Sequence, residues 1–418
     1  MDKFIIRGGK SLKGSVKISG SKNATLPVIA ATILAPGKYK LSNVPDLKDV
    51  HSMIGLLKHL GAQVEFFNNI LEIDTSNVNN YVAPYDIVRK MRASIYVLGS
   101  LLGRFKKAKV SLPGGCAWGP RPVDLHIQGI KKLNVNIELD EGYINANTKK
   151  LKGNLIDFPK SSVGATGNIL MAAVLAEGTT VINNAAKEPE IESLVKFLLK
   201  MGAEIEGLGS DTLAVTGVKE LHPVEEKMIP DRIEAATYLV AGAITCGEVE
   251  IRDCIPGHFE SVLEKLKIAG NELTINKDKV KISNPGGSLK SVDVITGVYP
   301  GFPTDMQAQW IALMAYADGI SYIEDRIFLD RFTHVAELVR LGADIKMENN
   351  IAIVTGVNKL KGAPVMSTDL RASASLVLAG LIAEGKTEIL RIYHIDRGYE
   401  RIGEKLQALG AEIVRVPT

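Results

Sequence analysis

Apolar and polar positions along the chain recur with a period of about seventy residues. Each period contains an amphipathic helix that ends at a small residue and leads directly into a short strand. Examples are LLKHLGAQVEF around Gly61, FLLKMGAEIEG around Gly202 and KLQALGAEIVRV around Gly410, and related segments surround Asn134, Gly270 and Gly342. Self-similarity at a fixed period indicates a repeat architecture in which every repeat is one folding unit.

A second pattern runs in phase with the first and consists of a nearly all-apolar helix, a glycine and a strand, as in AAVLAEGTTVI. A helix that is apolar on all sides is buried, and the glycine supplies the left-handed residue that ends it. Each repeat is therefore predicted to run strand, helix, strand, helix, strand, strand. In the third repeat the expected elements are 154–158, 164–176, 180–183, 188–201, 203–206 and 212–216.

The sixth repeat stops one strand short, and the N-terminal segment DKFIIRG has the character of the missing strand. We therefore expect an α/β protein with six βαβαββ repeats, three in each of two domains. The expected domains are 22–229 and 1–21 plus 230–418, the second one closed by the N-terminal strand. Clefts between domains are favoured ligand sites.

Composition narrows the class of protein without naming a function. The 418 residues are 46% hydrophobic and 23% charged, which is typical of a globular protein and excludes a disordered, fibrous or coiled-coil chain. A net charge of +3 gives no reason to expect nucleic-acid binding. Three cysteines suggest no disulfide framework, and the lack of CxxC and HExxH motifs predicts no metal site. Without a signal peptide or a long apolar run, we expect a soluble, cytoplasmic protein.

Polar residues gather where the buried helices are predicted to start. Helix N-termini favour anions, whereas a basic residue there opposes the helix dipole and makes sense if an anion is shared. Ordinary helix capping explains Ser162 and Asp231 equally well. The residues at these six starts are Lys22 and Asn23, Arg92, Ser162 and Gly164, Asp231 and Arg232, Asp305, and Asp369 and Arg371.

The segment PGGCAWGPRP, residues 113–122, is predicted to be a loop because glycine and proline dominate it. Cys116 has no apolar neighbours to bury it, and Arg121 is close enough in sequence to favour the thiolate. We therefore expect Cys116 to act as a nucleophile, an acid or a redox group, whereas Cys246 and Cys254 are interpreted as buried apolar residues. The residues alone thus predict a two-domain protein that binds a multiply charged anion.

Several long motifs carry a resemblance to a known family, namely LPGGCAWGPRPVDLHIQG, SGSKNATLP, PGFPTDMQAQ, TDLRASASLVLAG and YHIDRGYERI. Together they resemble the UDP-N-acetylglucosamine 1-carboxyvinyltransferases, which are enolpyruvyl transferases, and the resemblance spans the whole chain. It implies a two-domain inside-out α/β barrel. It also implies transfer of enolpyruvate from phosphoenolpyruvate to the 3′-hydroxyl of UDP-N-acetylglucosamine, with release of phosphate, by addition and elimination through a tetrahedral ketal. This is a step of peptidoglycan synthesis, and so of cell wall biogenesis and cell division.

The resemblance also implies roles for individual residues. Cys116 matches the proton donor, which is the thiol that fosfomycin alkylates, Asp305 matches the general base, and Lys22 and Arg397 complete the catalytic set. Asp369 is expected to orient Arg371. Residues that match phosphoenolpyruvate-binding positions are Lys22, Asn23, Arg121, Arg331, Arg371 and Arg397. Residues that match nucleotide-sugar positions are Asn23, Arg92, Arg121, Pro122, Val123, Asp124, Leu125, Lys160, Ser161, Ser162, Val163, Gly164, Asp305 and Ile327. No cofactor or metal is implied, and the expected partners are the two small substrates, with no nucleic acid or membrane.

Three alternatives remain at this stage. The sister enzyme that makes 5-enolpyruvylshikimate 3-phosphate has the same fold and donor but lacks the PGGC loop, so Cys116 argues against it. A non-catalytic anion- or RNA-binding repeat protein predicts basic residues spread over an outer face. A degenerate paralogue with a regulatory role is the third.

Overall fold

The computed structural model describes residues 2–89, 91–112 and 123–417. In this part of the chain, six four-stranded sheets are present. The chain divides into two compact units, which we call the terminal unit (residues 2–19 and 230–417) and the central unit (residues 20–112 and 123–229). Each unit contains three of the sheets. The six-repeat α/β fold predicted from the sequence is thus confirmed.

The third repeat illustrates how the pattern folds. Strand β10 (Leu155–Asp157) leads into α6 (Val163–Ala173), β11 (Thr179–Asn183), α7 (Pro189–Lys200), β12 (Glu204–Glu206) and β13 (Thr212–Thr216), all within a few residues of the expected bounds. β10 pairs parallel with β11, and β13 pairs antiparallel with both β11 and β12. The spatial order is therefore β10-β11-β13-β12.

The other elements follow the same plan. In the central unit they are β3 (Lys38–Ser42), β4 (Gln63–Phe67), β5 (Ile70–Asp74), β6 (Val82–Ala83), β7 (Lys107–Ser111), β8 (Asn136–Asp140), β9 (Tyr143–Asn147), β14 (Glu225–Lys227), α1 (Lys22–Ala31), α2 (Lys48–Leu60), α3 (Tyr85–Val88), α4 (Val97–Phe105), α5 (Asp124–Lys132), and the 3₁₀ turns η1 (Thr32–Leu34) and η2 (Arg92–Tyr96).

In the terminal unit they are β1 (Asp2–Arg7), β2 (Lys13–Lys17), β15 (Glu248–Arg252), β16 (Glu272–Ile275), β17 (Lys279–Ser283), β18 (Val294–Ile295), β19 (Ile320–Glu324), β20 (Asp344–Glu348), β21 (Ile351–Thr355), β22 (Pro364–Met366), β23 (Lys386–Leu390), β24 (Glu412–Pro417), α8 (Arg232–Ile244), α9 (Glu260–Ile268), α10 (Gln307–Met314), α11 (Val335–Arg340), α12 (Leu370–Ile382), α13 (Ile402–Ala408), η3 (Pro256–Phe259), η4 (Thr304–Met306) and η5 (Ile392–Arg397).

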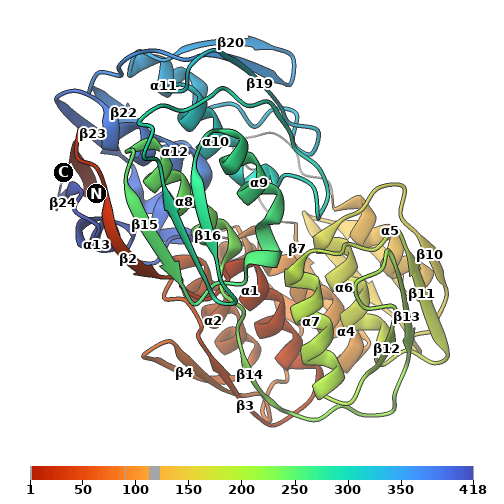
Figure 1. Ribbon diagram of the computed structural model, residues 1–418. Coiled ribbons are helices and arrows are strands. Elements are labelled where there is room, and N and C mark those ends of the chain that lie inside the picture. Colours follow the sequence, from red (N-terminus) through yellow and green to blue (C-terminus); the bar gives the residue numbers. More distant parts are fainter. Residues whose placement is uncertain (1, 90, 113–122, 418) are drawn as a thin grey trace. The chain divides into compact units, whose positions relative to one another are not determined.

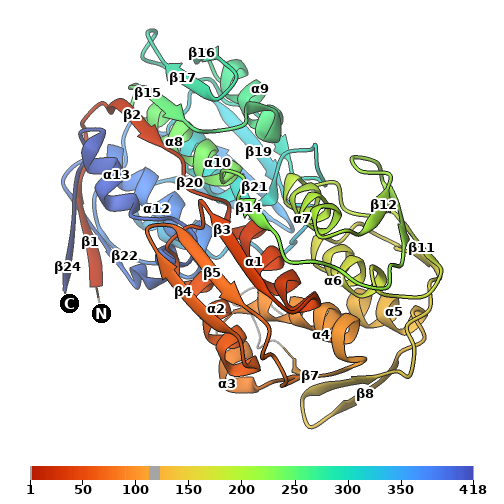
Figure 2. The ribbon, with the colours of Figure 1, turned by 90° about the horizontal axis from the view of Figure 1, so that it is seen from below.

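The apolar helices lie inside each unit and the sheets lie outside. In the terminal unit α8, α10 and α12 contact one another, and Figure 1 shows the sheets placed around them. In the central unit α4 contacts α1 and α6, with the same arrangement of sheets in Figure 2. Every residue of α8 from Ile233 to Ile244 is buried, because this helix is largely apolar and its one buried acid, Glu234, pairs with Lys405 (2.6 Å). This is the inside-out α/β barrel arrangement that the resemblance implied.

The amphipathic helices pack against the apolar helices and against edge strands: α2 contacts α1 and β4, and α7 contacts α1 and β12. Helix α2 buries Val50, Met53 and Leu57 and has an acidic residue, Asp49, in its first turn. It ends at Gly61, whose φ of 107° is a left-handed conformation that glycine adopts without strain. The glycine thus ends this amphipathic helix. The buried helices differ from the prediction: the C-cap of α6 is Val174, with a right-handed φ of -59°, and the left-handed Gly178 lies beyond it, at the turn into β11.

The second repeat of each unit departs from the others in two ways. In four repeats the residue after the second strand has a positive φ and turns the chain sharply, namely Asn43, Asn184, Asp253 and Arg391. After β19, Asp325 instead begins a longer loop that reaches α11, and the matching stretch after β7 contains residues 113–122, which lie outside the described part. In the same two repeats the buried helix is preceded by a 3₁₀ turn, η2 or η4. Arg92 and Asp305 lie in these turns, so the irregular repeats carry predicted site residues.

Strand β1 lies inside the last sheet, whose order is β22-β23-β1-β24. It pairs antiparallel with β23 and with β24, so it occupies the position that β13 holds in the third repeat. The chain crosses between the units at residues 19–20 and 229–230. On the terminal side of these crossings the backbone N–H of Asp231 donates to Ser19 O (2.9 Å), and on the central side that of Ser21 donates to Ile229 O (2.7 Å).

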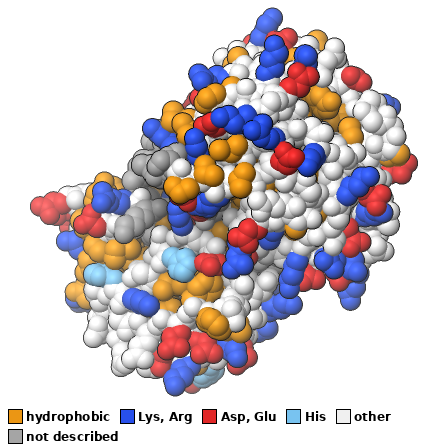
Figure 3. Space-filling view, turned by 90° about the vertical axis from the view of Figure 1, so that its left-hand side faces the viewer, with side chains coloured by type: hydrophobic (Ala, Val, Ile, Leu, Met, Phe, Trp, Pro, Cys, Tyr) orange, Lys and Arg blue, Asp and Glu red, His pale blue; other side chains and the backbone are white. Residues whose placement is uncertain are grey.

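The surface is chemically mixed. On the face drawn in Figure 3, Lys and Arg side chains are interspersed with Asp and Glu, unlike the basic face that an RNA-binding repeat protein predicts. Among the described residues, no helix has the length and apolar character needed to cross a membrane.

Candidate functional site

In the terminal unit a carboxylate lies between two buried arginines. Asp305, in η4, accepts a hydrogen bond at Oδ1 from Nη1 of Arg331 (2.8 Å) and one at Oδ2 from Nη2 of Arg371 (2.9 Å). The Asp305 side chain is 26% exposed, whereas those of Arg331 and Arg371 are 5% and 2% exposed. The structure therefore brings together three of the predicted site residues, which lie far apart in the sequence.

The local fold explains how Arg371 reaches this position. Arg371 is the second residue of α12, and Asp369 is the N-cap of that helix. The Asp369 carboxylate accepts from the backbone N–H groups of Arg371 (2.7 Å) and Ala372 (3.1 Å). Asp369 was expected to orient Arg371, and in these contacts it holds the backbone of Arg371 and of the next residue, as N-cap aspartates do.

The environment of Arg371 favours its charged form. Its guanidinium lies 5.3 Å from the ring centre of Tyr399, a cation–π distance. Burial opposes the charge, but the charges of Asp305 and Asp231 and the hydrogen bond to Asp305 raise the pKa of Arg371 above its ordinary value. Arg371 is thus a permanent buried cation at the edge of the site.

Two further predicted residues, Arg397 and Ile327, belong to the terminal unit. Arg397 ends η5 and is half-buried. Of the acidic residues near it in the sequence, Asp396 pairs with Arg415 (2.8 Å) and Glu400 accepts a hydrogen bond from the hydroxyl of Ser19 (2.6 Å). Ile327, which is 36% exposed, lies in the loop that follows β19.

In the central unit Lys22 is the first residue of α1. Its Nζ lies 3.6 Å from Oδ2 of Asp49, and the two side chains are 13% and 5% exposed. Asn23 follows and is half-buried, and Ser21 caps the helix by accepting from the N–H of Ala24 (3.3 Å). Asp49 was not singled out in the sequence, where it resembles an ordinary acid of a first helical turn.

At the start of α6 a side chain caps the helix, and the residues around the cap are partly accessible to solvent. Ser162 accepts from the N–H of Ala165 (3.3 Å), so the capping interpretation of Ser162 is correct. Asp231 likewise caps α8 through the N–H groups of Ile233 and Glu234. Lys160 is exposed, and residues 161–164 are half-buried. At the start of α5, Val123 is buried, Asp124 exposed and Leu125 half-buried.

His126, which no sequence motif marks, is buried near the start of α6. Its Nδ1 lies 2.8 Å from Nδ2 of Asn168, an amide nitrogen that can only donate, so the imidazole proton belongs on Nε2. Burial, together with the charge of Arg92, lowers the pKa of His126 to about 4. A Cβ on Gly164 would lie 3.0 Å from the ring, which shows how closely the imidazole packs against that helix start.

The predictions for Cys116, Arg121 and Pro122 fall on residues outside the described part of the chain. For the other two cysteines the structure corrects one expectation. Cys254 is buried, at 2% exposure, as expected. Cys246 is only half-buried and follows the end of α8 with a φ of 46°, because it turns the chain toward β15 instead of packing in the core.

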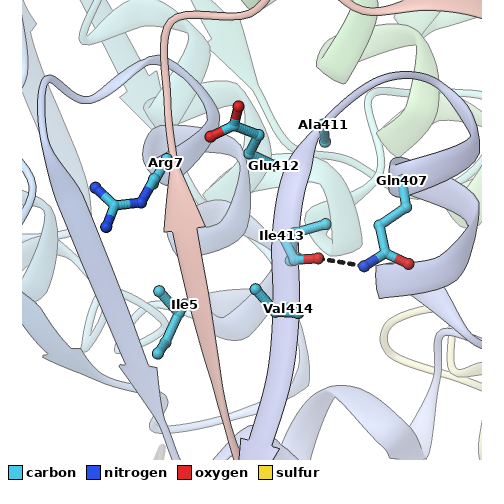
Figure 4. Close-up of a pocket in the computed structure, with 7 residues that line it drawn as sticks. All are labelled: Ile5, Arg7, Gln407, Ala411, Glu412, Ile413 and Val414. Carbon is cyan, nitrogen blue, oxygen red and sulfur yellow. Dashed lines mark hydrogen bonds between the residues drawn. The ribbon is translucent and has the colours of Figure 1, made fainter.

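A depression of about 300 Å³ lies on the outer face of the last sheet, where Figure 4 shows side chains of β1, β24 and α13. Arg7, Glu412 and Gln407 supply its polar groups, but Glu412 pairs with Lys10 (2.6 Å) and Gln407 donates to the carbonyl oxygen of Ile413 (2.5 Å). Among the described residues there is also no cluster suited to a metal ion. The depression therefore does not compete with the Asp305 cluster as a reaction site.

The fold is that of a class, the enolpyruvyl transferases, in which six βαβαββ repeats form two inside-out units. A family model described as EPSP synthase (3-phosphoshikimate 1-carboxyvinyltransferase) matches residues 6–406, and the chain belongs to this family. The solved structure of the enolpyruvyl transferase NikO from Streptomyces tendae superposes with a TM-score of 0.90 at 25% identity, covering 100% of this chain and 99% of that one.

Curated relatives are more similar in sequence. A UDP-N-acetylglucosamine 1-carboxyvinyltransferase of Chlorobium phaeovibrioides is 56% identical over 418 residues, which are 99% of this chain and 98% of the relative. One of Geotalea uraniireducens is 54% identical over 416 residues and 100% of both chains. The EPSP synthase of Acinetobacter baumannii, with a TM-score of 0.76 at 20% identity over 100% of both chains, shares the fold.

Proposed function

We propose that this chain transfers enolpyruvate from phosphoenolpyruvate to the 3′-hydroxyl of UDP-N-acetylglucosamine and releases phosphate. The observation that carries the proposal is the carboxylate of Asp305 held between two buried arginines. Relatives that are 54% to 56% identical over nearly their full length are named UDP-N-acetylglucosamine 1-carboxyvinyltransferase, which supports this choice of acceptor. The reaction belongs to the cytoplasmic stage of peptidoglycan synthesis.

The reaction needs cations because phosphoenolpyruvate has a phosphate and a carboxylate. We assign its binding to Lys22, Asn23, Arg121, Arg331, Arg371 and Arg397. Arg331 and Arg371 are already fixed by burial and by Asp305, so they need little rearrangement when charge develops in the transition state. Removing one such preorganised donor typically costs about 2.7–4 kcal/mol.

The proposed transfer of enolpyruvate has two steps, an addition and an elimination. In the addition the sugar oxygen bonds to carbon 2 of phosphoenolpyruvate, Asp305 takes the hydroxyl proton, and Cys116 gives a proton to carbon 3, which yields a tetrahedral ketal. In the elimination the Cys116 thiolate takes a proton from carbon 3, the bond from carbon 2 to the phosphate oxygen breaks, and phosphate departs with the proton that Asp305 held. The 26% exposure of Asp305 leaves its carboxylate accessible to an incoming hydroxyl. A positioned general base is typically worth about 10²–10⁴ in rate.

The nucleotide sugar is assigned to a second set of predicted positions, which shares Asn23 and Arg121 with the phosphoenolpyruvate set and also includes Asp305. In the central unit these are Asn23, Arg92, Arg121–Leu125 and Lys160–Gly164, where the N-terminus of α6 offers backbone N–H groups to a diphosphate. In the terminal unit they are Asp305 and Ile327.

The test is phosphate release from phosphoenolpyruvate with either UDP-N-acetylglucosamine or shikimate 3-phosphate as acceptor. We expect turnover only with the nucleotide sugar, and its loss in Cys116→Ala and Asp305→Asn. Cys246→Ala, a half-buried cysteine outside the site, is the matched control and should stay active. Turnover with shikimate 3-phosphate would assign the chain to the reaction named in the family description. Silence with both acceptors would favour a binding or regulatory role.

A further inference from the structure

Asp325 is a buried carboxylate that neither the sequence motifs nor the proposed reaction accounts for. It follows β19 and its side chain is 0% exposed. Its Oδ1 accepts from the hydroxyl of Thr296 (2.7 Å) and from the backbone N–H groups of Ile327 and Phe328 (2.9 Å each). Its Oδ2 accepts from the hydroxyl of Thr304 (2.7 Å). A buried carboxylate that is this completely satisfied is expensive to disturb.

The contact with Thr304 has a direction. A carboxylate accepts hydrogen bonds, so the single hydroxyl hydrogen of Thr304 points to Asp325. The hydroxyl oxygen is then left to accept, and it accepts from Nη1 of Arg331 at 3.1 Å. Because arginine only donates, the two bonds are compatible in one orientation of the hydroxyl alone.

The same Nη1 of Arg331 donates to Oδ1 of Asp305 at 2.8 Å. Thr304 also precedes Asp305 in η4, so Asp325 acts on Asp305 through its neighbour in the chain and through its arginine. Thr296 serves as the comparison for Thr304, because its hydroxyl also binds Asp325. Its hydroxyl donates to Asp325 and accepts from the backbone N–H of Arg326 (3.0 Å), away from Arg331.

We propose that Asp325 is a positioning residue for the reaction: by fixing the Thr304 hydroxyl it holds Arg331 against Asp305. The inference rests on the proposed function for its kinetic consequence, whereas its geometric content is independent of that function. The proposed role of Asp325 also explains why the second repeat of the terminal unit lacks the sharp turn that four other repeats have after their second strand. The departing loop lets Asp325 face η4 and carries Ile327 and Arg331.

The test compares two valine substitutions that are alike in chemistry. Thr304→Val and Thr296→Val each remove one hydroxyl donor of 2.7 Å from Asp325, so both should lower the melting temperature to a similar extent. Only Thr304→Val interrupts the path to Arg331. We expect it to lower kcat about 10- to 100-fold with a much smaller change in KM, as for an interaction used in the transition state. Thr304→Ser, which keeps the hydroxyl, should restore kcat to within about threefold of wild type.

Thr296→Val should keep kcat within about threefold of wild type. Equal losses of kcat in the two valine variants would overturn the proposal, because the effect would then follow stability alone. Crystal structures of both variants give a readout without turnover. Arg331 should leave Asp305 in Thr304→Val and stay in Thr296→Val. Arg331 unmoved in Thr304→Val would overturn the proposal even if the wild-type enzyme uses another acceptor. If Arg331 leaves Asp305 in Thr304→Val as expected but the wild-type enzyme is inactive, only the proposed function would be contradicted.

Discussion

Nη2 of Arg371 lies 2.9 Å from Oδ2 of Asp305, although the arginine side chain is only 2% exposed. A buried ion pair of this kind is sensitive to loss of either member, because the remaining charge stays desolvated. Arg371 also contacts the ring of Tyr399, whose hydroxyl accepts from Gln309 (3.1 Å), and the same amide of Gln309 donates to the backbone oxygen of Asp305 (2.9 Å). Asp305 is thus held by both its side chain and its main chain.

Arg371→Lys should test whether the planar guanidinium is needed or only its charge. Lysine keeps the charge but cannot reproduce the forked donor or its stacking on Tyr399. We expect kcat to fall about 10²- to 10³-fold, the range found when one preorganised donor is removed. Arg340→Lys is the control, because Arg340 is 56% exposed and donates to the backbone oxygen of Pro364. Steady-state kinetics measure both, and a normal kcat in the Arg371→Lys enzyme would contradict the role given to Arg371.

Asp49→Asn should weaken phosphoenolpyruvate binding through Lys22. The ammonium of Lys22 sits at the N-terminus of α1, where the helix dipole disfavours a cation, and Asp49 at 3.6 Å offsets this. We expect KM for phosphoenolpyruvate to rise about tenfold, the equivalent of roughly 1.4 kcal/mol. Asp46→Asn removes an exposed acid that pairs with His51 and should leave KM within about twofold. Equal KM values in the two variants would show that Lys22 does not depend on Asp49.

Stability should fall as the pH drops below 6.5, because two histidines are buried in neutral form. Burial and the charge of Arg92 lower the pKa of His126 to about 4. Burial likewise lowers the pKa of His334 to about 4, with Asp369 raising and Arg331 lowering it further. Between pH 4 and 6.5 the unfolded chain binds more protons, so each histidine should reduce the free energy of unfolding by about 1.4 kcal/mol per pH unit on acidification.

His126 lies in the central unit and His334 in the terminal unit. Urea unfolding at pH 5, 6 and 7.5 should therefore show a shallower pH dependence in His126→Gln and His334→Gln than in wild type. The difference should vanish above pH 7, where both states of the wild-type protein have neutral imidazoles. An unchanged slope in both variants would mean that other groups control the acid sensitivity.

Cys254 should resist alkylation in the folded protein. It is 2% exposed, and burial and the charge of Asp278 raise the pKa of its thiol to about 11. At pH 7.5 its thiolate fraction is then below roughly one in a thousand. Iodoacetamide labelling followed by peptide mass spectrometry should leave Cys254 unmodified until urea is added, with Cys246 slow and Cys116 fast. Rapid labelling of Cys254 without urea would show that the terminal unit opens locally.

The fold was predictable because its signals are local and repeated. Helix α7 was placed at 188–201 and occupies Pro189–Lys200, since an apolar stripe and a terminal glycine identify it from sequence alone. Helix α6 ends at Ala173, earlier than the predicted 176, because Ala and Leu continue an apolar pattern past the point where the backbone turns.

The site was predictable only in part. Arg331 and Arg371 were placed by resemblance, but their convergence on Asp305 depends on segments 26 and 66 residues away from it. Asp325 looks like a solvated loop acid in YIEDRIF, and its burial depends on Thr296 and Thr304 from earlier segments. A comparison of the six strand ends gives no signal in the sequence, because Asp253 stands at the same place in its repeat and makes the sharp turn with a positive φ.

The position of β1 has a consequence for the order of events during synthesis. β1 and β2 leave the ribosome first, yet their partners β23, β24 and β15 come more than two hundred residues later, as the bond between Lys3 and Glu388, 385 residues apart, illustrates. Both segments of the central unit, residues 20–112 and 123–229, have been synthesised by then. Contacts this distant in sequence form slowly, and domains generally fold as units in the order of their synthesis. The nascent chain should therefore carry a finished central unit while its first two strands still wait for partners, and a stall after residue 229 would leave those strands unpaired.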